Sequence, residues 1–163
     1  MTRQEHLDRV NEIFRLYIGP GTRGNSAVNI NSLLGQVNEA SDAQLKSFLS
    51  LHEFTMNLGS GVTPHATGHK GLMFDYWSDS LRSSGARFCA LWMVTNGRHA
   101  DQVHIYLHKL GLEEAISLSG IPGQLWDFTN DAGGVPHVWV MPTEDNVHRI
   151  EPLLRVSHGY SIS

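Results

Sequence analysis

The stretch ARFCALWMVTNGRHADQVHIYLHK, residues 86–109, holds the two most regular apolar patterns of the chain. Its first part is almost continuously apolar over the length of one strand, which predicts a buried β-strand. Its last part, residues 102–109, alternates strictly between apolar side chains and mostly histidine or tyrosine, which predicts a strand with one face in the core. A helix is the alternative for this last part, because it would align Asp101 with His104 and His108.

N-terminal to this stretch the apolar residues recur at helical spacing. Thr2 and Glu5 form a capping-box pattern ahead of an apolar stripe, which predicts a first helix. Ser41 and Gln44 predict the start of another helix, and Gly59 is expected to end it as the residue after its last turn.

C-terminal to the stretch the pattern alternates between short helices and short strands. Residues 112–119 are expected to be helical. Residues 124–128 and 135–141 flank a glycine-rich loop, which is the composition of a β-hairpin. Thr143 is expected to cap a last short helix that Pro152 disturbs.

Helices followed by strands that are joined by hairpins indicate an α+β fold. We expect the N-terminal helices to pack on a mainly antiparallel sheet of about four strands. With 163 residues, the chain is long enough for one ordinary core, so a single domain over residues 1–163 is expected.

Composition restricts the classes of partner. The formal net charge is -4, and lysine and arginine are scattered, so no nucleic-acid partner is expected. The longest apolar run, residues 88–94, is far shorter than the roughly 20 residues of a membrane helix. The N-terminus lacks the apolar segment of a signal peptide, so a soluble, cytoplasmic protein is expected. Cys89 lies in the apolar run, where a buried, inert thiol is expected.

Ten histidines in the chain make a metal or proton-transfer site worth testing. The glycine-rich run of residues 59–77 predicts a constrained loop that carries His65 and His69. A catalytic zinc ion needs three protein ligands, and His65, Asp75 and His137 can supply them, with His69 as the reserve for the first.

A zinc hydrolase also needs groups that act on water and substrate. Asp131, or alternatively Asp127, would take the proton of the zinc-bound water. His104 would line the substrate groove and stabilise the oxyanion. The sequence hypothesis is therefore a zinc-dependent, peptidase-like hydrolase with Zn²⁺ as cofactor.

Two short segments resemble a known family. TPHATGH at residues 63–69, followed by Asp75, resembles the first metal motif of the D-Ala-D-Ala carboxypeptidase and L-alanyl-D-glutamate endopeptidase family. DAGGVPHVWV at residues 131–140 is similar to the second motif, in which an acidic residue precedes a histidine. The resemblance implies an α+β fold with a central antiparallel sheet, one Zn²⁺, and hydrolysis of peptide bonds in cell-wall stem peptides.

Two further functions remain open. The segments around His104 and His137 share the pattern apolar-His-apolar-aromatic-apolar, which resembles the paired strands of two-histidine phosphoesterases, with Tyr106 and Trp139 where that family has hydroxyl residues. Alternatively, the four tryptophans and ten histidines make a surface for a non-enzymatic binding or assembly protein, with a possible homo-oligomer as its product.

Overall fold

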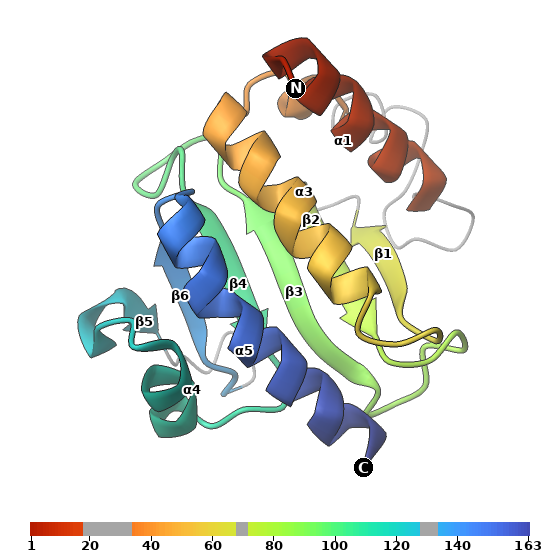
Figure 1. Ribbon diagram of the computed structural model, residues 1–163, viewed down its shortest axis with the longest axis vertical. Coiled ribbons are helices and arrows are strands. Elements are labelled where there is room, and N and C mark those ends of the chain that lie inside the picture. The colour runs from red at the N-terminus through yellow and green to blue at the C-terminus, as the bar shows by residue number, and fades with distance from the viewer. Residues whose placement is uncertain (18–33, 68–71, 128–133) are drawn as a thin grey trace.

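The computed structural model describes residues 1–17, 34–67, 72–127 and 134–163. These residues form a six-stranded antiparallel sheet with helices packed on one of its faces (Figure 1). The α+β class predicted from the sequence is confirmed, with six strands in place of about four.

The elements follow one another in the order helices, strands, and then alternating helices and strands. The helices are α1 (Arg3–Tyr17), α3 (Asp42–Met56), α4 (Leu112–Ser119) and α5 (Glu144–Ile162), with a short 3-10 helix η1 (Gly123–Leu125). The strands are β1 (Thr63–Thr67), β2 (Leu72–Trp77), β3 (Arg87–Met93), β4 (Val103–Leu107), β5 (Trp126–Asp127) and β6 (His137–Val140). Their order across the sheet is β1-β2-β3-β4-β6-β5, and every neighbouring pair is antiparallel.

Helix α3 begins as its sequence predicts and ends earlier than predicted. The Ser41 side chain accepts a hydrogen bond from the backbone of Gln44, and the Gln44 side chain accepts one from the backbone of Ser41. The C-cap is Asn57, with φ -87° and ψ 0°, so the prediction that Gly59 ends the helix is wrong. The Asn57 N–H donates to carbonyls of the last turn, and this closes the helix before the glycine is reached.

The segment before β2 is a strand, whereas the sequence predicted a loop. β1 is an edge strand that pairs only with β2 and includes His65. Pro64 fits there because the missing N–H of a proline is tolerated in a strand that has no neighbour on one side. The loop prediction failed because it was based on proline and glycine content. Composition does not show that the segment becomes an edge strand, where a proline is tolerated.

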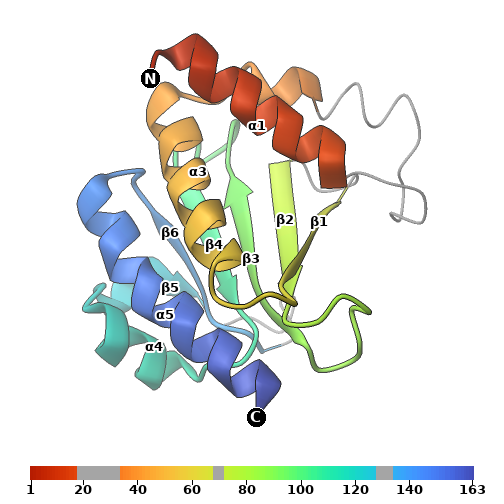
Figure 2. The ribbon, with the colours of Figure 1, turned by 45° about the vertical axis from the view of Figure 1, so that its right-hand side comes forward.

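Helix α5 is longer than predicted and contains Pro152 in its interior. A proline inside a helix costs about 3 kcal/mol. α5 lies across the sheet beside α3, and it buries an apolar stripe against β3 and β4, including Ile150, Leu153 and Leu154 (Figures 1 and 2). Burial of this stripe offsets the cost of the proline. None of the described helices is both long and apolar enough to cross a membrane.

The core lies between the sheet and the layer formed by α1, α3 and α5. Phe74 of β2 is fully buried there and contacts the rings of Phe14 on α1 and Phe48 on α3. His52 of α3 is also buried, and its Nδ1 lies 2.7 Å from the hydroxyl of Tyr76. His52 is thus a hydrogen-bonded core residue rather than a ligand.

Candidate functional site

The second face of the sheet is the one that no described helix covers. Side chains alternate along a strand, so the register that turns Phe74 and Tyr76 toward the helices turns their neighbours the other way. We call this surface the open face (Figure 2). Its described members are His65, Met73, Asp75, Trp77, Ala90, Trp92, His104, Tyr106, His137, Trp139 and Asp127. Three of the four tryptophans therefore lie on one side of the sheet.

The predicted metal ligands all belong to the open face but lie on different strands. His65 and Asp75 are direct partners on β1 and β2. Ala90 and Tyr106 stand between Asp75 and His137 in the same row, which puts the two backbones roughly 14 Å apart at about 4.8 Å per strand.

The structure therefore does not bring the three predicted ligands together. Among the described residues, no group of three or more His, Cys, Asp or Glu side chains is placed to hold a metal ion. The predicted base Asp131 and the reserve ligand His69 lie outside the described residues, so the zinc site stays a prediction.

The structure does bring His104 and His137 together, although they are distant in the sequence. His104 on β4 and His137 on β6 are diagonal neighbours, and His104 Nε2 lies 2.7 Å from His137 Nδ1. The ring of Tyr106 stacks on His137 at 4.8 Å and an interplanar angle of 13°. The strand predicted over residues 102–109 is confirmed by β4, and the helical alternative is wrong.

Both imidazoles are buried and neutral at pH 7. Burial, together with smaller contributions from the neighbouring His137 and His99, lowers the pKa of His104 to about 3. Burial also lowers the pKa of His137, whereas the carboxylate of Asp127 opposes this shift. The nearest approach of these two groups, from His137 Nε2 to Asp127 Oδ2, is 3.9 Å.

The hydrogen bond between the two histidines favours one arrangement of protons. His104 Nδ1 and His137 Nε2 are buried and make no hydrogen bond. If His104 Nε2–H donates to His137 Nδ1, the remaining N–H is on His137 and points to the carboxylate of Asp127. The atom left over is then an acceptor on His104, and a buried acceptor without a partner costs less than a buried donor. A pKa of about 3 makes His104 a weak base at neutral pH.

An aromatic ladder continues from His104 to the turn between β3 and β4. Trp139 lies between two imidazoles, with His104 stacked at 4.1 Å and His99 stacked at 4.2 Å. His99 belongs to the turn between β3 and β4, and its Nδ1 lies 2.9 Å from Gln102 Oε1. Sequence reasoning missed His99, because no spacing pattern connects a turn residue with a strand five elements later.

The turn that carries His99 is held by α3. The Gln44 side chain is fully buried, and its Nε2 donates to the carbonyls of Val94 and Gln102 at 2.8 Å each. Each of these carbonyls also accepts a backbone hydrogen bond across the turn. Helix α3 thus fixes the position of the turn relative to the open face.

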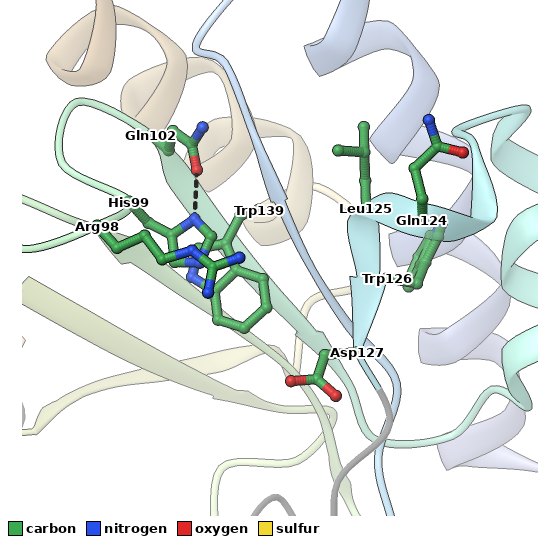
Figure 3. A pocket seen from close by; sticks show the side chains of 8 residues that line it. All are labelled: Arg98, His99, Gln102, Gln124, Leu125, Trp126, Asp127 and Trp139. Carbon is green, nitrogen blue, oxygen red and sulfur yellow. Dashed lines mark hydrogen bonds between the residues drawn. The ribbon is translucent and has the colours of Figure 1, made fainter.

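A pocket of about 360 Å³ lies where this turn faces η1 and β5 (Figure 3). Its lining combines aromatic rings, amides and two charged groups: Arg98, His99, Gln102, Gln124, Leu125, Trp126, Asp127 and Trp139.

A second cationic side chain, Arg82, lies at the other end of the open face. Arg82 Nη1 lies 2.6 Å from His65 Nδ1, and its guanidinium lies 5.9 Å from the centre of the Trp77 ring.

The open face and its pocket thus form an aromatic, histidine-rich surface in which burial lowers the pKa values of His65, His104 and His137. Comparison with known proteins gives no family for the chain, since no family model, no curated protein and no solved structure matches it.

Proposed function

We propose that the protein is a non-enzymatic assembly protein whose open face packs against the open face of a second copy. The observation that carries the proposal is the position of Trp77, Trp92, Tyr106 and Trp139, all half-buried, on the one sheet face that no described helix covers. Aromatic residues are the usual anchors of protein interfaces.

The electrostatics of the open face suit contact with an identical surface. The centre of an interface is depleted of charge. On this face burial lowers the pKa values of His65, His104 and His137, and the carboxylate of Asp75 is itself buried. Two copies related by a twofold axis would therefore meet without strong repulsion between like charges.

The edges of the sheet direct association to the face. β1 carries Pro64, which cannot donate a backbone hydrogen bond to an added strand. β5, at the other edge, has only two residues. Short edge strands and edge prolines both oppose pairing between sheets of different molecules. Because pairing between sheet edges is opposed, we expect association to occur through contact between the open faces, which would bury the aromatic residues.

Sedimentation equilibrium tests the assembly. We expect a mass of twice 18.1 kDa for the wild type and a monomer for Trp92→Glu, because two carboxylates would then meet in the contact. Met73→Glu, a second substitution on the face, should act in the same way. Leu16→Glu, at an exposed position on α1, is the matched control and should leave the dimer intact.

Circular dichroism of each variant separates loss of assembly from loss of fold. A wild-type protein that stays monomeric up to about 1 mM, where association stronger than about 4 kcal/mol would be detected, contradicts the proposal. So does a dimer that persists in both folded variants of the face.

A second candidate is a metal-independent phosphoesterase, and the 2.7 Å contact between His104 and His137 favours it. In this function His137, rather than His104 with its pKa of about 3, takes a proton from the attacking water, and Asp127 stabilises the imidazolium that forms. The zinc hydrolase predicted from the sequence, acting on peptides or cell-wall stem peptides, is the competing enzymatic hypothesis.

One activity assay separates the two enzymatic hypotheses. For the phosphoesterase we expect hydrolysis of bis(p-nitrophenyl) phosphate that is unchanged in excess chelator and falls about 100-fold or more in His104→Ala. The exposed His148 provides the control, and His148→Ala should hydrolyse the ester at the wild-type rate. Hydrolysis of a peptide substrate that a chelator abolishes and Zn²⁺ restores would support the zinc enzyme instead. If the protein hydrolyses neither the phosphodiester nor the peptide, both enzymatic hypotheses fail and the assembly proposal is the one that is left.

A further inference from the structure

The pocket beside the open face has the size and lining of a small-molecule site. Its volume of about 360 Å³ lies within the roughly 300–1,000 Å³ of typical ligand pockets. Figure 3 shows Arg98, His99 and Trp139 on one side, and Gln124, Leu125 and Trp126 across from them. A ligand in the pocket would lie between these two groups of side chains.

Aromatic side chains line the pocket, which suits a flat ligand. His99 stacks on one face of Trp139 at 4.2 Å and 12°, and His104 stacks on the other, so the outer face of His99 is the one left for a ligand. Trp126 borders the pocket from the opposite side, but its ring is 9% exposed and belongs to the core, where its indole N–H donates to the Ile121 carbonyl at 3.3 Å. Planar heteroaromatic groups bind such rings by stacking and edge contacts.

Two groups of opposite charge reach the pocket. Arg98 is exposed, and no hydrogen bond or ion pair joins it to another described residue. Its guanidinium can bind an anion with two parallel hydrogen bonds. The side chain of Asp127 is 41% exposed, and its carboxylate can accept hydrogen bonds from N–H groups of a ligand.

The turn that supplies Arg98 and His99 is positioned before any ligand arrives. Gln44 binds both ends of the turn, and Gln102 binds the His99 ring. A site that is already ordered loses less conformational entropy when it binds its ligand. The preordered turn is therefore suited to binding a ligand.

We propose that this pocket binds a heteroaromatic ring that carries an N–H donor and an anionic substituent, which is the chemistry of a nucleoside monophosphate. The ring stacks on the outer face of His99, its N–H donates to Asp127, and the anion binds Arg98. The site goes beyond the assembly proposal, because Arg98 and His99 belong to the turn between β3 and β4 and not to the open face, whereas Trp139 and Asp127 belong to both.

Isothermal titration calorimetry with adenosine 5′-monophosphate tests the proposal on the full chain. We expect saturable binding with one site per chain, and weaker binding of adenosine and of inorganic phosphate. Arg98→Met should weaken the monophosphate about tenfold or more and leave adenosine unchanged, because only the charged hydrogen bonds are lost. Arg15→Met, an exposed arginine on α1, is the matched control and should bind as the wild type does.

Asp127→Asn tests the other end of the ligand. It should weaken the monophosphate and adenosine by the same factor, because both carry the N–H groups. Lack of binding by the wild type up to about 1 mM, or equal affinity of Arg98→Met and the wild type, overturns the proposal. Trp92 does not line the pocket, so monomeric Trp92→Glu should bind the ligand, and failure of the assembly proposal would leave this result unaffected.

Discussion

Acidification from pH 7 to pH 5 is expected to lower the free energy of unfolding by about 5 kcal/mol, because three histidines resist protonation in the native state. Burial lowers the pKa of His52 to about 4 and the pKa values of His104 and His108 to about 3, from 6.5. Positive charge adds to the shift in each case, from Arg9 at His52 and from other basic groups at His104 and His108.

The sign follows from proton binding. Below pH 6.5 the unfolded chain protonates these histidines, whereas the folded chain keeps them neutral until about pH 4 to 3. The unfolded state thus binds more protons, so stability is complete above pH 6.5 and is lost as the pH falls. Three such groups give a slope of up to about 4 kcal/mol per pH unit. Because a typical domain has only about 5–15 kcal/mol, acid unfolding should begin near pH 5.

Urea unfolding at pH 7, 6 and 5, followed by far-UV circular dichroism, measures this slope. His108→Gln should reduce it by about a third, since one of the three groups no longer titrates. His148 is the matched control, because its side chain is 66% exposed, and His148→Gln should leave the slope unchanged. Equal stability at pH 7 and pH 5 would show that the buried histidines do not control acid unfolding.

Phe74→Ala is expected to lower the free energy of unfolding by about 3–5 kcal/mol, the usual cost of removing a buried phenylalanine ring. Phe74 is fully buried, and its ring centre lies 4.5 Å from that of Phe14 and 5.5 Å from that of Phe48. It therefore joins β2 to both α1 and α3. Because the two helices and the sheet share this contact, the surroundings cannot collapse fully into the cavity.

Thermal and urea unfolding of this variant provide the measurement. The melting temperature should fall by about 10 °C, given the enthalpy of a domain of this size. Leu81→Ala is the control, since Leu81 is 86% exposed, and it should change the stability by less than about 0.5 kcal/mol. If Phe74→Ala lowers the free energy of unfolding by less than about 1 kcal/mol, the Phe74 ring does not join the sheet to α1 and α3.

The sequence singled out the residues of the candidate site for different roles. His137 was selected as a metal ligand, His104 as an oxyanion-stabilising group and Asp127 as the alternative base, and the structure places the three near one another on the open face. The proposed zinc triad came from the same kind of spacing argument, and its members occupy separate strands. Spacing along the chain cannot tell these outcomes apart, because strand order decides which residues become neighbours.

Local sequence by itself determined the capping boxes of α1 and α3, the alternation of β4 and the extent of α4, because these depend on residues three or four positions apart or on every second side chain. Tertiary structure decided the rest. It made an edge strand of a segment rich in glycine and proline, and it kept α5 helical through Pro152. It also placed His99 against Trp139. In each case the deciding free energy came from burial or stacking between segments far apart in the sequence, which no local pattern contains.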